Sequence, residues 1–175
     1  GIFKFVGALG AGTWASGGSM NTAREGTAGV GTQTAALNST GYASTGIVGV
    51  NESYDGSSWS EVADVNTARS FGSASGTQSA SLYATGATAG SNNNRVTNVE
   101  TWDGSSWTEI ADVNTAKYYS GTTGNAPATS NINFGGQGDN TTGIVNTENY
   151  DGTSWTEVAD LNLGRRTRGI GDSST

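Results

Sequence analysis

Four tryptophans recur along the chain at intervals of 45, 48 and 48 residues. They are Trp14, Trp59, Trp107 and Trp155. An asparagine follows each of them by seven residues, at Asn21, Asn66, Asn114 and Asn162. A basic residue follows each asparagine by three, at Arg24, Arg69, Lys117 and Arg165. Self-similarity at a fixed period of this length is typical of repeat architectures, in which one supersecondary unit stacks on the next. The sequence therefore predicts an array of structural repeats.

The residues inside each period favour strands over helices. Periods of about 40 to 50 residues occur both in helical arrays and in propeller blades. A helical repeat needs apolar residues at 3.6-residue spacing over roughly 10 to 15 residues, and the chain has no such stripe. Glycine is frequent instead, at 28 of 175 residues, and aromatic residues stand at regular intervals. We therefore expect four short strands in each period.

The strands can be placed by their flanking residues. The first strands are expected at about 27–34, 71–79 and 118–123, and the second at 36–40, 81–85 and 131–134. The third strands are expected at 49–54, 97–102 and 145–150. The fourth would begin at the repeated tryptophan and end near Val62, Ile110 and Val158. Asp-Gly pairs at 55–56, 103–104 and 151–152 predict a tight turn between the third and fourth strands, because glycine takes positive φ without strain.

A strand that ends in Gly-Gly, then a variable loop, Glu-x-Tyr-Asp and a tryptophan together resemble the kelch repeat. Gly135-Gly136, Tyr150 and Trp155 match this pattern best. Thr40-Gly41 and Thr85-Gly86 keep only the second glycine, and Trp102 replaces the tyrosine. The resemblance covers residues 15–175 and implies an all-β fold made of four-stranded antiparallel blades of a kelch-type β-propeller. The repeated Tyr-Asp-Gly, Ser-Trp and Ala-Asp-Leu-Asn variant is similar to the kelch-like proteins of marine bacteriophages and their hosts.

The repeat boundaries predict a partial propeller. Whole periods span 15–59, 60–107 and 108–155, residues 1–14 form an N-terminal partial blade, and 156–175 start a further blade. Closed propellers need about four to eight blades. Either the chain is a segment of a longer protein, or several copies complete one ring. We favour the segment, because an open stack of three blades would leave two apolar faces and sheet edges exposed.

The repeated side chains are expected to be structural. The tryptophans and the third-strand aromatics Tyr54, Trp102 and Tyr150 would fill the wedges between blades. The glutamates Glu52, Glu100 and Glu148 share the period of the basic residues, which predicts ion pairs between blades and fixed turns. A catalytic set of carboxylates is the alternative, but catalysis needs one asymmetric site and these residues recur in every blade. The asparagines are expected to cap turns rather than to bind a ligand.

Composition excludes several kinds of chemistry. The chain has no His and no Cys, which removes disulfides, zinc-thiolate sites, cysteine nucleophiles and Ser-His-Asp triads from these residues. Kelch-fold copper-radical oxidases need Tyr, Cys and His, and two of the three residue types are missing. The net charge of −7 disfavours nucleic acid, and no apolar stretch is long enough for a membrane span. We expect no enzyme activity, no cofactor and no metal; Ca²⁺ at Asp139 and Asn140 is an alternative to a plain Asp-Asn turn.

The variable loops between the second and third strands are the expected recognition surface. They span 41–46, 86–95 and 136–143 and would emerge on one face of the propeller. The candidate partner-binding residues are Asn92, Asn93, Asn94, Arg95, Gln137, Asp139 and Asn140. Their polar side chains suit a host-surface glycan or another virion or surface protein; plain solvated loops are the alternative. The expected function is a structural or attachment module of a virion or extracellular surface, within a larger assembly. A general protein-interaction module and, less favoured, a sugar-acting propeller enzyme are the other readings.

Overall fold

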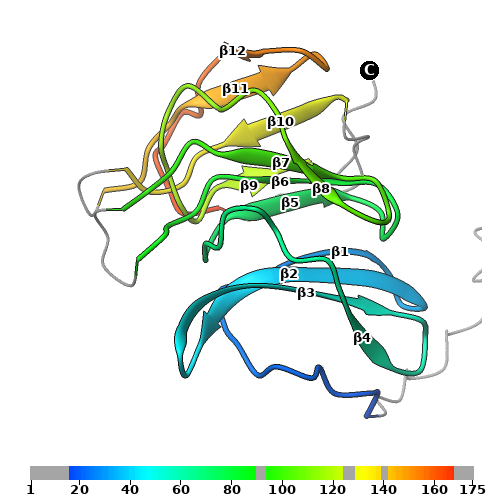
Figure 1. Cartoon of the computed structure of the whole chain (residues 1–175). Helices are drawn as coiled ribbons and strands as arrows, with labels where there is room; N and C mark the ends of the chain where they lie inside the picture. The colour runs from blue at the N-terminus through cyan, green and yellow to red at the C-terminus, as the bar shows by residue number, and fades with distance from the viewer. Residues whose placement is uncertain (1–15, 90–93, 124–128, 139–141, 168–175) are drawn as a thin grey trace, which may run out of the picture.

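The chain is an all-β protein in a computed structural model that describes residues 16–89, 94–123, 129–138 and 142–167. Within these ranges there are twelve strands and no helix. The strands form three four-stranded antiparallel sheets, and in each sheet the strands neighbour one another in chain order (Figure 1). Each sheet corresponds to one period of the sequence. The prediction of four antiparallel strands per period is therefore confirmed.

The strand bounds repeat from sheet to sheet. The first sheet contains β1 (Ala28–Thr32), β2 (Ala35–Ala43), β3 (Gly46–Tyr54) and β4 (Trp59–Val62). The second contains β5 (Ser73–Gly76), β6 (Ser81–Ala84), β7 (Val99–Trp102) and β8 (Trp107–Glu109). The third contains β9 (Gly121–Thr122), β10 (Asn131–Phe134), β11 (Thr147–Tyr150) and β12 (Trp155–Glu157). As expected from the sequence, the fourth strand of each sheet begins at the repeated tryptophan.

Two sets of strands differ in length from the expectation. The first strands β5 and β9 are shorter, because Phe71 and Tyr119 just before them have positive φ (60° and 54°), which interrupts an extended strand. In the first sheet, β2 and β3 are longer and occupy most of the segment 41–46 that was expected to be a loop. The ladder continues there past a register shift between Ser39 and Gly41.

The turn between the third and fourth strands is the same in all three sheets. Gly56, Gly104 and Gly152 have φ of 98°, 97° and 97°, which only glycine adopts readily. The preceding aspartates, Asp55, Asp103 and Asp151, each accept backbone N–H groups from the residues two and three positions on. The N–H of Ser106, with the hydroxyl and N–H of Ser105, lowers the pKa of Asp103 to about 2, and the pKa values of Asp55 and Asp151 are lowered in the same way. The ionised carboxylate is thus part of the turn.

These turns predict a loss of stability in acid. Because the folded-state pKa of each aspartate lies below its unfolded value, the stabilisation is present above about pH 4 and is lost as the pH falls toward about 2. A triple variant with Asn at 55, 103 and 151 should therefore show a smaller fall in melting temperature over this range. The control triple has Asn at 64, 112 and 160, which are exposed and follow the fourth strands. Equal acid sensitivity of both triples would contradict the prediction.

The three sheets stack so that their first strands adjoin. β1 lies beside β5, and β5 lies beside β9. In Figure 1 the first sheet is at the bottom in blue and cyan, the second is in the middle in green, and the third is at the top in yellow and orange. One apolar cluster fills the space between the first and second sheets, and another fills the space between the second and third. The first cluster contains Ala28, Leu37, Val65, Tyr83, Trp102 and Trp107, and the second contains Leu82, Ala84, Val99, Val113, Tyr150 and Trp155.

Backbone hydrogen bonds join successive sheets in a repeating pattern. We call residues 21–27, 66–72, 114–120 and 162–167 the lead-in segments. Phe71 N donates to Gly26 O at 2.8 Å, Tyr119 N to Phe71 O at 2.8 Å, and Thr167 N to Tyr119 O at 2.9 Å. A second series runs from Gly41 N, Gly86 N and Gly136 N to the carbonyls of Arg69, Lys117 and Arg165 at 3.4, 2.9 and 2.8 Å. The first series joins each lead-in segment to the one before it, and the second joins the last three lead-in segments to the preceding sheet.

Candidate functional site

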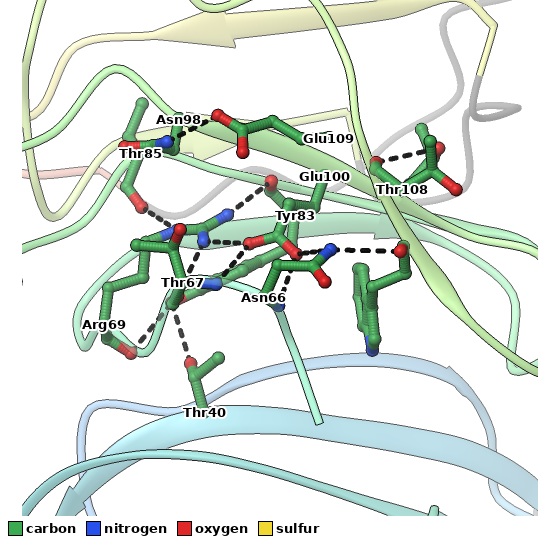
Figure 2. Close-up of polar contacts among 12 residues, drawn as sticks. Thr40, Asn66, Thr67, Arg69, Tyr83, Thr85, Asn98, Glu100, Thr108 and Glu109 are labelled. Carbon is green, nitrogen blue, oxygen red and sulfur yellow. Dashed lines mark hydrogen bonds and ion pairs between the residues drawn. The ribbon is translucent and has the colours of Figure 1, made fainter. Parts of the chain in front are cut away.

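A buried ion pair recurs in every sheet, and Figure 2 shows its second copy. The Arg69 Nη1 lies 2.5 Å from Glu100 Oε1, and both side chains are completely buried. The other Glu100 oxygen accepts from the backbone N and the side-chain amide of Asn66 at 2.7 and 2.9 Å. Arg24 and Glu52 form the same pair in the first sheet, and Lys117 Nζ lies 3.1 Å from Glu148 Oε1 in the third. The repeated Asn, basic residue and Glu thus form one network.

The rest of the Arg69 guanidinium is bonded to main-chain carbonyls. Its Nε donates to Thr85 O at 2.9 Å, Nη1 to Thr67 O at 2.8 Å, and Nη2 to Tyr83 O at 3.1 Å. The guanidinium also lies 4.3 Å from the centre of the Tyr83 ring, a cation–π contact. Burying a charge is tolerated only when it is paired and hydrogen-bonded, and this site meets both conditions. The network holds the lead-in segment against the third strand of a sheet.

These pairs correct one expectation from the sequence. The charges were expected to pair from one blade to the next, but each pair joins a lead-in segment to the sheet into which that same segment leads. The reason is the short connection: the basic residue lies a few residues before the first strand and therefore reaches the face of its own sheet. The preceding sheet is instead hydrogen-bonded to the backbone carbonyl of the basic residue, as Gly86 N is to Lys117 O.

Donors from the lead-in segments surround the buried glutamates, and at Glu52 they favour the charged form. Burial raises the pKa of Glu52, but the backbone N–H groups of Asn21 and Thr22 and the guanidinium of Arg24 outweigh burial, so the pKa is lowered overall. In the third sheet, burial lowers the pKa of Lys117, whereas the nearby Glu148 carboxylate raises it. Lone pairs of each carboxylate are therefore occupied by donors from the lead-in segment.

The repeated aromatic residues fill the spaces between sheets. Trp102 and Trp107 are opposed in register, with ring centres 5.4 Å apart, and belong to the cluster against the first sheet. Tyr150 and Trp155 lie 5.1 Å apart against the second sheet, and the Trp155 indole donates to Ala111 O at 2.9 Å. The equivalent pair of the first sheet, Tyr54 and Trp59, is only partly buried. Trp14 lies outside the described residues.

The predicted loop residues are only partly within the described chain. Asn92, Asn93, Asp139 and Asn140 lie outside it. Asn94 is exposed, and its carbonyl accepts from the Thr88 N at 2.9 Å, while Arg95 pairs with Ala87 in a short bridge. Gln137 is only 1% exposed, and its Oε1 accepts from Arg166 Nε at 2.6 Å. A direct surface contact does not fit Gln137, because its backbone pairs with Tyr118 and turns the side chain inward.

A cavity of about 240 Å³ lies where the first strands of the three sheets meet. Phe71 and Tyr119 line it, with ring centres 4.7 Å apart. Both residues have positive φ, and Gly26 has the same conformation at the equivalent position of the first repeat (64°). Positive φ is strained for a bulky residue, and such strain clusters at functional sites. Nothing in the sequence distinguishes this pair, because Phe71 and Tyr119 lie in segments where aromatic residues favour a strand.

Glycine, alanine, serine and threonine residues form the rest of the cavity wall, and Asn133 lies behind two of its serines. Ser73 Oγ lies 3.0 Å from Ser120 Oγ, and Asn133 Nδ2 donates to both at 3.1 Å. The Asn133 Oδ1 atom is buried without a hydrogen-bond partner in the described structure. No charged side chain is among the described residues that line the cavity. Such a wall suits a small neutral ligand that carries hydroxyl groups and one apolar face.

Within the described ranges, no group of three or more His, Cys, Asp or Glu residues is placed to hold a metal ion. None of the described residues forms a helix that is long and apolar enough to cross a membrane. No protein-family model and no curated protein sequence matches this chain.

Proposed function

We propose that the three sheets are blades of a kelch-type β-propeller, and that the chain is a non-enzymatic structural and attachment module of a virion or an extracellular surface. Three features support the propeller. Each sheet has four antiparallel strands in chain order, the first strands adjoin, and the same backbone bonds connect each sheet to the next. In a propeller, blades of this kind surround a central axis with their first strands innermost.

The observation that carries the attachment role is the cavity at the inner strands. All three sheets contribute to it, so a stack, and not one sheet alone, completes the site. The rings of Phe71 and Tyr119, tilted by 48° to each other, offer apolar surface, and Ser73, Ser120 and Thr122 offer hydroxyl oxygens. A hexose has the matching chemistry, with one apolar ring face and a rim of hydroxyls. We propose that the attachment partner is a neutral sugar unit of a glycan.

Replacing Tyr119 with glycine tests this role without a large loss of folding stability. Glycine adopts the positive φ at this position without strain, so the backbone is relieved while the ring is removed. Saturation-transfer NMR with the methyl glycosides of glucose, galactose and mannose should detect at least one ligand for the native chain. We expect the affinity to fall at least about fivefold in the variant, because a ring contact of this kind contributes about 1 kcal/mol or more.

The matched control is Tyr119→Phe, which keeps the ring and should retain binding. Signals of equal size in the glycine variant, or none in the native chain, would contradict a sugar site in this cavity. The alternative function, a general kelch-type protein-interaction module, would then be favoured, with exposed loop residues such as Asn94 as its contacts. Appearance of a new sugar product in the same spectra would favour a sugar-acting enzyme.

A further inference from the structure

The described residues leave the outer face of the third sheet without the packed neighbouring sheet that each of the other two sheets has. Leu37 of the first sheet and Leu82 of the second are 1% and 0% exposed, because each lies under the aromatic residues of the following sheet. The equivalent residue of the third sheet, Ile132, is only partly buried. Val158 is 43% exposed, whereas its equivalents Val62 and Ile110 pack against an apolar cluster. The third sheet therefore exposes aliphatic side chains whose equivalents in the first and second sheets are buried under the following sheet.

The last lead-in segment already has the backbone arrangement that precedes a sheet. Leu161 N donates to Val145 O at 3.0 Å, as Val113 N donates to Thr97 O at 3.1 Å one period earlier. Gly136 N donates to Arg165 O, and Thr167 N donates to Tyr119 O. These bonds are equivalent to those of the preceding lead-in segment, from Gly86 N to Lys117 O and from Tyr119 N to Phe71 O. Thr167 Oγ1 adds a bond to Phe134 O at 2.9 Å. The backbone is thus in position to lead into a further sheet.

Among the described residues, Arg165 of this segment has no carboxylate partner like those of its equivalents. Arg24, Arg69 and Lys117 each hold a buried glutamate. Arg165 is exposed, its Nε donates to Leu163 O at 3.3 Å, and it forms no ion pair with a described residue. Asn162 is also exposed, whereas Asn66 and Asn114 bind a glutamate through both nitrogen atoms. The three equivalent sites each hold a glutamate carboxylate, so a carboxylate is the group that would complete the site at Arg165 and Asn162.

We propose that this face, formed by Ile132, Val158, Leu161, Asn162 and Arg165, docks one further four-stranded sheet of the same repeat. The glutamate on the third strand of that sheet pairs with Arg165 and accepts from Asn162, and the tryptophan on its fourth strand covers Ile132 and Leu161. Charge complementarity and continuity with the two interfaces already formed identify this occupant. The proposal rests on the propeller arrangement proposed above and adds the partner of this surface.

A chain extended by one repeat tests the docking. Residues 1–167 are followed by a second copy of residues 120–167, which places the new glutamate at the same spacing from Arg165 as Glu148 has from Lys117. Hydrogen exchange followed by mass spectrometry reports the protection of the added third strand. We expect this strand to exchange as slowly as β11. Arg165→Met should speed its exchange at least about tenfold, and the same substitution in the original chain should leave β11 unchanged.

Three results would overturn the proposal. One is an added third strand that exchanges as fast as an unfolded peptide. Another is an Arg165→Met substitution that has no effect in the extended chain. The third is concentration-dependent association of the original chain in sedimentation that Arg165→Met abolishes, since the occupant would then be a second copy. Sugar binding is measured separately on the original chain, so a failure of docking and a failure of the attachment role are distinguishable.

Discussion

Replacing Glu100 with glutamine should lower the free energy of unfolding by roughly 3–5 kcal/mol, the cost of leaving one partner of a buried ion pair uncompensated. The Arg69 side chain is completely buried and, among the described residues, contacts no carboxylate other than that of Glu100. The neutral amide would also present an NH₂ group or a weaker acceptor to the backbone of Asn66 and Thr67. Guanidinium unfolding followed by tryptophan fluorescence measures the loss. Since single domains are stable by about 5–15 kcal/mol, this loss is a large share of the total stability.

Glu109→Gln is the matched control for this substitution. Glu109 lies directly opposite Glu100 in the β7–β8 register, but it is exposed and accepts only from the Asn98 amide at 2.8 Å (Figure 2). Its replacement should change stability by less than about 0.5 kcal/mol. A double variant with apolar residues at 69 and 100 should be less damaging than Glu100→Gln alone, because no charge is left buried. Similar losses for Glu100→Gln and Glu109→Gln would show that the buried pair does not hold the sheet.

Trp107→Ala should cost about 3–5 kcal/mol, the usual loss for removing a buried tryptophan. The indole is 7% exposed and packs in the cluster between the first and second sheets, against Trp102 and with its ring centre 6.5 Å from that of Tyr83. The substitution opens a cavity at the interface between two sheets, so they should also separate more readily. Chemical unfolding gives the free energy, and hydrogen exchange in β1 and β5 reports the local separation.

The first sheet provides an internal comparison through Trp59→Ala. Trp59 occupies the same register position opposite Tyr54, but it is only partly buried among the described residues. Its replacement should therefore cost clearly less than that of Trp107. Equal losses at the two positions would mean that burial between sheets is not the source of the stabilisation.

The sequence predicted the features that depend on local residue order. The tryptophan spacing placed the start of β4, β8 and β12, and the Asp-Gly pairs placed the turns before them. The Gly-Gly pair at 135–136 marked the end of the strand expected at 131–134, and β10 has these bounds. Each of these features depends only on residues that are close in the sequence and on the conformations that turn residues prefer. Each strand or turn could therefore be predicted by itself.

Features that depend on contacts between repeats could not be predicted from local sequence. Phe71 and Tyr119 are good strand formers, yet their positive φ follows from bonds to the preceding lead-in segment. The direction of the Arg69–Glu100 pair depends on which face of a sheet the lead-in segment crosses, and the sequence spacing is compatible with either choice. Gln137 looked like a loop residue because the pairing of its backbone with Tyr118 has no sequence signal.

The placement of the ion pairs bears on how such an array changes length. Because each buried cation and its carboxylate lie within one period, a period can be duplicated or deleted without leaving a charge stranded in the interior. Pairs that crossed from sheet to sheet would instead leave one charge unpaired at each end of the array, and each would cost several kcal/mol if buried. Arg165, the equivalent cation of the last described lead-in segment, is exposed. Recombination at the repeated asparagine would therefore leave every buried ion pair intact, so the array can change by whole periods.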